Sequence, residues 1–289
     1  MWYLITIVIL AFAASRGAQR VLTSVSLETL DGWTITALSL LLSCLVWLPI
    51  AWHRKWIILS KDLWIKSIPL SVVNIVIPAL AFTFAQLFVT AGVAALFVSF
   101  LPVTVALLAW AFIKQKPSTK VSVGVGIATI GVIMLSIGRN GALDVDNWWA
   151  GVALLALGIL SAAAVYVGWR KLLSEYQAVE LLSPQLVISS LAVIPVASIF
   201  GNLSSLTIDI IPLLLFLGIV NYIIPQLAMF WLLTRTTSVR AALANYLAPV
   251  FAIILGAVFL GEPITFILIA SGALIIIGAS FVNSSKSKK

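Results

Sequence analysis

The chain has few charged residues and few groups suited to catalysis. Only 9% of its 289 residues are charged, and it holds a single Cys and a single His. One cysteine excludes a disulfide within the chain. No HExxH, Gly-x-Ser-x-Gly or phosphate-binding Gly loop is present. The sequence therefore gives no support to an enzyme, and we expect no metal and no cofactor.

Long apolar runs take up most of the sequence instead. Hydrophobic residues make up 62% of the chain, and the mean hydropathy is +1.19. A helix needs about 20 apolar residues to span a hydrocarbon core of about 30 Å. The sequence therefore predicts an all-α integral membrane protein. Its ten expected transmembrane helices cover about 2–22, 31–52, 65–88, 91–113, 120–138, 148–170, 180–200, 210–233, 238–260 and 264–282.

Two of these apolar runs carry the same Asn-x-x-x-Pro pattern. Asn74 and Pro78 form the first copy, and Asn221 and Pro225 form the second, with both residues displaced by 147 positions (221 − 74 and 225 − 78). A constant displacement over such a distance indicates that the chain was duplicated.

The duplication divides the expected helices into two repeats of five, residues 1–140 and 141–289. A unit with an odd number of spans inserts its copy upside down, so we expect inverted repeats. An axis in the membrane plane then relates the halves, and equivalent groups meet near the midplane, where secondary transporters hold their substrates. Rocking of one half against the other gives alternating access.

Basic residues are unevenly distributed over the expected connectors. With the N-terminus inside, 14 of the 17 lie on the inner side, and Arg16, Arg20 and Arg139 lie on or near the outer side. This bias predicts an inner-membrane protein with both termini in the cytoplasm. The net charge of +8 lies at helix ends and not on a soluble face. We therefore expect contact with the lipid bilayer and no nucleic-acid partner.

The paired asparagines lie deep in their spans. Asn74 and Asn221 follow the expected helix starts by about eight and eleven residues, which places them about 12–17 Å deep. An amide in hydrocarbon needs a polar partner or a water-filled cavity. Pro78 and Pro225 also disturb the helical bonds to the carbonyls four residues earlier. We interpret both clusters as parts of a substrate path, and the alternative is that they only join neighbouring helices.

Other polar and aromatic residues complete this expected path. The predicted substrate-binding residues are Asn74, Pro78, Phe82, Ser99, Tyr166, Asn221, Tyr222, Pro225, Gln226, Asn245, Tyr246 and Arg16. An arginine inside a span is by default a functional residue, here for a carboxylate. The alternative for Arg16 and its neighbour Arg20 is that both extend to the lipid headgroups.

No Asp or Glu falls in the middle third of any expected span. A proton-coupled exchanger of cationic drugs needs such an acid, so this class is disfavoured. The remaining amides, hydroxyls and one Arg suit a neutral or zwitterionic solute. Inward-lying Trp residues leave open a carrier of a quaternary ammonium or lipophilic cation, such as choline or a drug. A non-transporting membrane scaffold or an intramembrane enzyme is the alternative from another class.

The stretch 239–278 combines an alanine-rich helix, a proline, a Gly-Glu turn and a closing helix with paired glycines. These positions are Ala241, Ala242, Pro249, Gly261, Glu262, Gly272 and Gly278. In this pattern the chain resembles the EamA-type transporters of the drug/metabolite transporter superfamily, similar to amino-acid and metabolite exporters. The resemblance implies ten helices with both termini cytoplasmic. It also implies export or uptake of small metabolites, commonly amino acids, through a central cavity.

We therefore expect a secondary transporter that uses alternating access through a central cavity. Its leading substrate is a neutral or zwitterionic amino acid, aromatic or otherwise hydrophobic, and export is the leading direction. Its expected partners are this small molecule and the bilayer. The sequence is compatible with a monomer.

Overall fold

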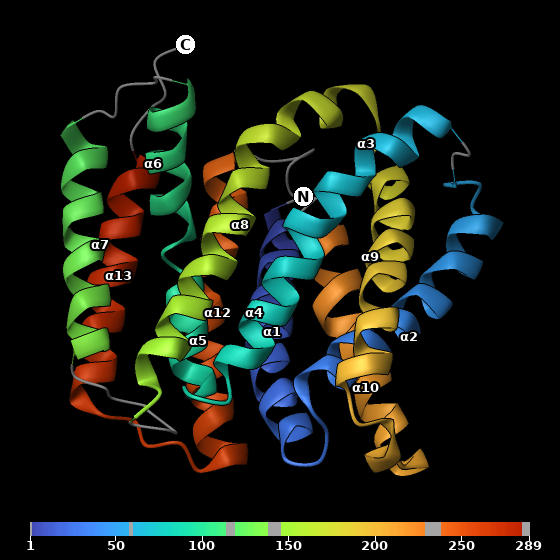
Figure 1. The fold of residues 1–289 in the computed structure, drawn as a ribbon. Helices are drawn as coiled ribbons and strands as arrows, with labels where there is room; N and C mark the ends of the chain where they lie inside the picture. Colours follow the sequence, from blue (N-terminus) through green and yellow to red (C-terminus); the bar gives the residue numbers. More distant parts are fainter. Residues whose placement is uncertain (1, 58–59, 114–118, 138–145, 229–237, 285–289) are drawn as a thin grey trace.

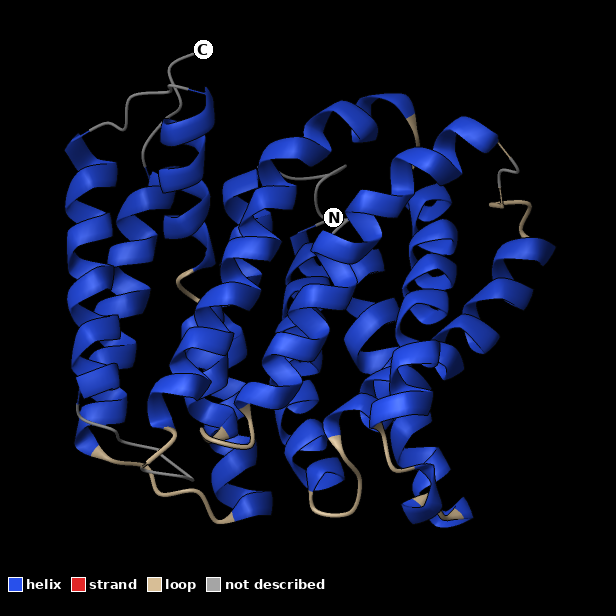
Figure 2. Ribbon diagram, in the orientation of Figure 1, coloured by secondary structure: helices blue, strands red, loops and turns tan. Residues whose placement is uncertain are grey.

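The computed structural model describes residues 2–57, 60–113, 119–137, 146–228 and 238–284 (Figure 1). Helices joined by turns and loops account for all of these residues, and no strand occurs among them (Figure 2). The predicted all-α class is confirmed for this part of the chain.

The first half of the chain forms a row of helices broken by one π-helical turn, η1. Its elements are α1 (Trp2–Leu27), α2 (Gly32–His53), α3 (Lys61–Ser71), η1 (Val72–Val76), α4 (Ile77–Ala85), α5 (Ala91–Val98), α6 (Leu101–Ile113) and α7 (Thr119–Ile137).

The second half has a similar order, with a π-helical turn, η4, and two short 3₁₀ turns, η2 and η3. Its elements are α8 (Trp148–Glu175), α9 (Ala178–Phe200), η2 (Leu203–Ser205), η3 (Ile208–Ile210), α10 (Ile211–Gly218), η4 (Ile219–Ile223), α12 (Ser238–Leu260) and α13 (Phe266–Ser284).

Six helical stretches of the described residues are long and apolar enough to cross a membrane. They are Gly32–His53, Lys61–Ala85, Ala91–Phe112, Trp148–Val165, Val179–Phe200 and Ile208–Ala228. Shorter apolar helices cover Ser122–Met134, Ala248–Leu260 and Phe266–Gly278. Large apolar side chains such as Phe112, Phe259 and Phe266 point outward and are mostly exposed. An apolar outer surface of this kind suits contact with lipid.

Helices of the two predicted repeats pack against one another. The pairs in contact include α1 with α12, α2 with α9, α4 with α8, and α7 with α13. The helices run in opposite directions within the pair α2 and α9, and also within the pair α7 and α13 (Figure 1). The two halves therefore do not form separate bodies, because each contributes helices to a shared interior.

Glycines allow two of these pairs to approach closely. A Cβ atom on Gly17 of α1 would lie 2.5 Å from the Cβ of Phe251 on α12. A Cβ atom on Gly131 of α7 would lie 2.8 Å from Cγ1 of Ile275 on α13. Helices inside a membrane gain stability mainly from close packing, so small residues at the crossings favour both contacts.

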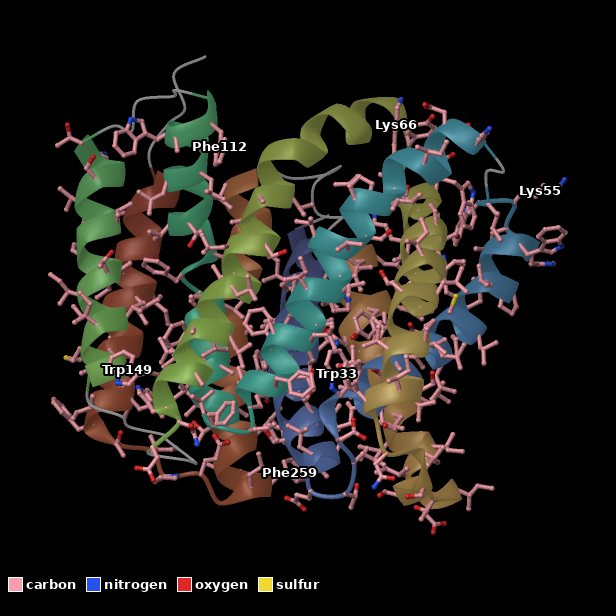
Figure 3. The ribbon with its side chains drawn as sticks, viewed as in Figure 1. Trp33, Lys55, Lys66, Phe112, Trp149 and Phe259 are labelled. Atoms are coloured by element: carbon pink, nitrogen blue, oxygen red, sulfur yellow. The ribbon has the colours of Figure 1, made fainter. Side chains whose placement is uncertain are left out.

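Charged and aromatic residues mark the ends of the bundle. Lys55 and Lys66 lie at the upper end in Figure 3, whereas Trp33 and Trp149 lie towards the lower end. Tryptophan is favoured at membrane–water boundaries and lysine at cytoplasmic ends. The assignment of the upper end to the cytoplasm remains a prediction.

Candidate functional site

Two π-helical turns occupy equivalent places in the two halves. Val72–Val76 and Ile219–Ile223 are displaced by 147 residues at both ends (219 − 72 and 223 − 76). The backbone N–H of Ile77 donates to the carbonyl of Val72, and that of Ile224 donates to the carbonyl of Ile219, each five residues back. The sequence repeat therefore has a structural counterpart, and π-helical turns of this kind often occur at functional sites.

Proline explains why each helix widens at this point. Pro78 and Pro225 follow the turns by two residues, lack an N–H and collide with the carbonyl four residues earlier. In the first half, the residue five positions after Val73 is Pro78, which has no N–H to donate, so the carbonyl of Val73 is available to another helix. The hydroxyl of Ser161 on α8 donates to it at 2.6 Å. The proline pattern thus joins η1 to the second half of the chain.

The side chain of Asn74 makes a second link across the halves. Its Nδ2 donates to Oε1 of Gln185 on α9 at 2.8 Å, and Gln185 is only 2% exposed. In this conformation Asn74 joins neighbouring helices, as the alternative interpretation of the sequence proposed. The Asn74 amide is therefore satisfied by the Gln185 amide, a partner that the sequence pattern did not predict.

The second asparagine has no matching partner. The position related to Gln185 by the displacement is Leu38 (185 − 147), which cannot accept a hydrogen bond. Asn221 is half-buried and makes no side-chain hydrogen bond to another described residue. Its neighbour Tyr222 is buried, and the Tyr222 hydroxyl interacts with Ser39 on α2. The two halves therefore share a backbone geometry but surround it with different side chains.

Two arginines lie on one face of α1. Arg16 follows Trp2 by 14 residues and precedes Leu27 by 11, so it lies near the middle of the helix. Its Nη1 donates to Oε1 of Gln19 at 3.3 Å. Arg20 is only 4% exposed. The alternative in which Arg20 extends to the headgroups does not fit a side chain that the protein encloses.

Arg20 lies over an aromatic ring of the first half. Its guanidinium carbon is 4.1 Å from the ring centroid of Phe82 on α4. Such a cation–π contact contributes about 0.5–2 kcal/mol. Enclosing a charged group costs several kcal/mol more than that unless an opposite charge accompanies it. Nη1 of Arg20 has no hydrogen-bond partner in the described part of the chain, so the ring alone does not offset the burial.

Polar groups extend from this pair of arginines along the same helices. The Ser24 hydroxyl on α1 donates to Oε1 of Gln86 at 3.2 Å. The Thr36 hydroxyl on α2 lies 3.5 Å from that of Thr83 on α4. All four residues belong to the first half and lie within a helix or directly after one. The two contacts join α1 to the end of α4 and α2 to α4.

The structure brings some predicted site residues together and separates others. Arg16, Phe82 and Tyr222 surround or influence Arg20. Asn74 belongs to a different contact, with Gln185. Pro78 and Pro225 are buried next to their π-turns, Gln226 is half-buried, and the hydroxyl of the buried Ser99 has no described hydrogen-bond partner. The side chains of Tyr166, Asn245 and Tyr246 lie outside the described residues.

Arg20 is the main residue that the predicted set omitted. The spacing of four residues from Arg16 was a usable signal, because it places both guanidinium groups on one helical face. The partners of Arg20 come from parts of the chain far away in sequence. For this reason its burial was not visible from α1 alone.

The α1–α2 connection is fixed to the second half by a carboxylate. Asp31 caps α2 by accepting the backbone N–H of Trp33 at 2.9 Å and that of Thr34 at 3.0 Å. It also accepts the N–H of Asn202, beyond α9, at 2.7 Å. Burial works to raise the pKa of Asp31, but the hydrogen bonds from Asn202, Thr34 and Trp33 lower it below its ordinary value.

Glu262 also links the two halves, with a carboxylate of the second half that accepts backbone N–H groups of the first. It follows Gly261, whose positive φ of 65° closes the turn after α12. Its carboxylate accepts the N–H of Ala91 at 2.7 Å and that of Gly92 at 3.2 Å, at the start of α5. Burial raises the pKa of Glu262, and the two N–H donors oppose that rise. The Gly-Glu turn of the second half thus caps a helix of the first.

An apolar groove of about 490 Å³ lies elsewhere, at the end of α2. It is lined by Leu45, Leu48, Pro49, Trp52 and Ile57. None of the predicted site residues belongs to it, and its largely exposed apolar lining suits lipid contact.

The profile of the EamA-like transporter family matches the chain twice, over residues 2–137 and 149–284. The chain belongs to this family. The second match begins and ends 147 residues after the first (149 − 2 and 284 − 137), which is the displacement of the Asn-x-x-x-Pro pattern.

Proteins similar to this EamA chain include transporters of an archaeon and a bacterium. An "Uncharacterized transporter" of Archaeoglobus fulgidus is 26% identical over 238 residues, covering 78% of this chain and 81% of the relative. The "Uncharacterized transporter YvbV" of Bacillus subtilis is 27% identical over 207 residues, covering 70% and 66%. A solved structure titled "Crystal structure of protein" superposes with a TM-score of 0.65 at 15% identity, covering 96% of this chain and 94% of that one. This last likeness shows the fold alone.

The EamA assignment and the apolar helices lead to one coarse conclusion. The chain is a multi-pass membrane protein and belongs with transporters of small molecules.

Proposed function

We propose that the protein is a secondary transporter of ten spans that moves a small metabolite by alternating access between two inverted halves. The halves are residues 1–140 and 141–289. The matching π-turns and the opposite directions of α2 and α9 support an inverted relation. The excess of basic residues on one side supports an inner-membrane location with both termini in the cytoplasm.

The observation that carries the proposal is the charged site inside the bundle. Arg20 of α1 lies over Phe82 of α4, and both Arg20 and Arg16 of α1 interact with Tyr222 of η4. A charge inside a membrane protein is costly and usually belongs to a substrate or ion path. Because Tyr222 comes from the second half and the other three residues come from the first, relative movement of the halves would open this site.

The proposed substrate is a small metabolite with a carboxylate group. Amino acids, aromatic or otherwise hydrophobic, are the leading class, and export is the leading direction. Arg16 is proposed as a carboxylate partner, and Phe82 and Tyr222 as the apolar walls. The half-buried Asn221, which has no described side-chain partner, is the asparagine best suited to contact solute. A choline-like cation is less compatible with two neighbouring arginines.

Solute counterflow in liposomes tests the proposal. Purified protein is reconstituted with one unlabelled metabolite inside, and uptake of the labelled form is measured. The panel covers amino acids, organic acids and quaternary ammonium compounds, with protein-free liposomes as the control. We expect accelerated exchange for a carboxylate-bearing solute. A complete lack of exchange across the panel would favour the scaffold alternative, and exchange of choline alone would favour the cation carrier.

A further inference from the structure

Arg20 is a buried cation, and at least one of its hydrogen-bond donors has no partner among the described residues. The side chain is more than nine-tenths buried, and one face of its guanidinium group lies over the ring of Phe82. A guanidinium group carries five N–H donors in its plane, and contact with a ring leaves donors that can bond to other groups. One of them, Nη1, is buried and has no described hydrogen-bond partner.

The charges around Arg20 do not balance. The charged side chain that influences it most is Arg16, which has the same sign, and Tyr222 contributes a neutral hydroxyl. No carboxylate of a described residue forms an ion pair with Arg20. None of the nine acids lies within 2–27, 32–53 or 72–85, the ranges of the surrounding first-half elements, and Glu28, eight residues after Arg20 (28 − 20), is exposed beyond the end of α1. Two like charges inside a low-dielectric interior repel each other more strongly than in water.

We infer that Arg20 is the anion-binding group of the transport site and that the bound substrate carries a net negative charge. A carboxylate fits this place because its two oxygens match the fork of a guanidinium group and form paired, charge-assisted hydrogen bonds. The aromatic side chains of Phe82 and Tyr222 provide apolar surface for the rest of the molecule. The inference rests on the proposed transport function and narrows its substrate class.

The ammonium group of an amino acid is what distinguishes it from a simple organic acid at this site. A zwitterion needs an acceptor for its ammonium group as well as a donor for its carboxylate. The groups beside Arg20 are Arg16, the ring of Phe82 and the hydroxyl of Tyr222, and no carboxylate of a described residue pairs with it. A second positive charge beside Arg16 and Arg20 would add repulsion. A simple organic acid therefore suits the site better than the amino acid of the same shape.

Three small probes isolate the charge of the ligand. 3-Phenylpropionate, phenylalanine and phenethylamine share a phenyl ring and a two-carbon chain, and carry net charges of about −1, 0 and +1 at neutral pH. Binding is measured as thermal stabilisation of the purified, full-length protein in detergent, over a range of probe concentrations. Both 3-phenylpropionate and phenylalanine offer a carboxylate to Arg20, but phenylalanine also brings an ammonium group that Arg16 and Arg20 repel. We therefore expect 3-phenylpropionate to bind about tenfold or more tightly than phenylalanine. We expect no stabilisation by phenethylamine.

Variants of Arg20 test the residue itself. Arg20→Gln removes the charge and should weaken the binding of 3-phenylpropionate by about tenfold or more. Arg20→Lys keeps the charge without the fork, and should bind with intermediate affinity. Arg54→Gln, at the exposed end of α2, is the matched control and should bind as the unmodified protein does. Size-exclusion profiles show that each variant is folded, and Arg20→Lys replaces Arg20→Gln if the latter aggregates.

The outcomes separate this inference from the proposed function. Equal affinity for phenylalanine and 3-phenylpropionate would overturn it, and so would unchanged binding by both Arg20 variants. Equal protection by sodium chloride at the same concentration would also overturn it, since the site would then hold an inorganic anion. If binding follows Arg20 but no organic acid exchanges in liposomes, the anion site stands and the transport function fails.

Discussion

The contact between Asn74 and Gln185 gives a prediction that separates structural from transport roles. Leucine at position 74 removes the donor and leaves the Gln185 side chain, which is 2% exposed, without the partner that it has at 2.8 Å. A buried polar group that loses its partner costs about 1–3 kcal/mol. We therefore expect Asn74→Leu to lower the free energy of unfolding by about 1–3 kcal/mol.

The second partner can be removed in the same way. In the double variant Asn74→Leu/Gln185→Leu no buried amide is left unpaired, and replacement of both partners by apolar groups is close to neutral. We expect its free energy of unfolding to return to within about 1 kcal/mol of the original protein. The coupling between the two positions is the difference between the double variant and the sum of the single ones.

Asn221→Leu is the matched control because the repeat places it at the same point of the other half. Asn221 has no described side-chain hydrogen bond, so its replacement should change the unfolding free energy by less than about 0.5 kcal/mol. We expect this variant to reduce solute counterflow several-fold instead.

Unfolding of the purified protein by a denaturing detergent, followed by circular dichroism, measures the stability of the original protein and of the variants Asn74→Leu, Gln185→Leu, Asn74→Leu/Gln185→Leu and Asn221→Leu. If Asn74→Leu were as stable as the original and only its transport were lost, the structural role of Asn74 would be refuted. Equal loss of stability in Asn221→Leu would refute the asymmetry between the halves.

Three further predictions concern the links between helices. Glu262→Ala removes the acceptor for two backbone N–H groups and should destabilise the protein by about 1–2 kcal/mol, measured by detergent unfolding. The pKa of Asp31 is lower when folded, so its stabilisation is present above the unfolded pKa, about 3.9, and is lost as the pH falls through the folded pKa. An Asp31→Ala variant should lack this loss of stability. If its stability fell between pH 6 and pH 2 just as that of the original protein does, the assignment to Asp31 would be contradicted. Gly17→Ala places a Cβ 2.5 Å from Phe251 and should cost about 1–3 kcal/mol. Gly126→Ala meets nothing within 4 Å and should be neutral or stabilising, so equal melting temperatures of these two variants would refute the packing argument.

Parts of the site were accessible from the sequence because they depend on local chemistry. A proline disturbs its own helix whatever surrounds it, and so the Asn-x-x-x-Pro copies correctly marked the two places where the backbone departs from an α-helix. The prediction that Asn74 and Asn221 play equivalent roles follows only from the repeat. The structure gives Asn74 an amide partner and gives Asn221 none among the described residues. Their common role in a substrate path stays a prediction.

The environment of Arg20 could not be predicted from the sequence in this way. Helical spacing places Arg16 and Arg20 on one face of α1, but it does not say whether that face meets lipid or protein. The answer depends on Phe82 and Tyr222, which lie 62 and 202 positions further along the chain (82 − 20 and 222 − 20). Neither residue carries a sequence signal that pairs it with an arginine.

The sequence by itself determined the membrane location, the helical class and the duplication, because these depend on hydrophobicity, backbone hydrogen bonding and a fixed displacement along the chain. The tertiary structure alone decided which side chains meet: Asn74 with Gln185, Arg20 with Phe82, and Glu262 with the start of α5. The physical reason is that apolar helices pack through many weak, similar contacts, so the relative positions of distant helices depend on the packing of the whole bundle.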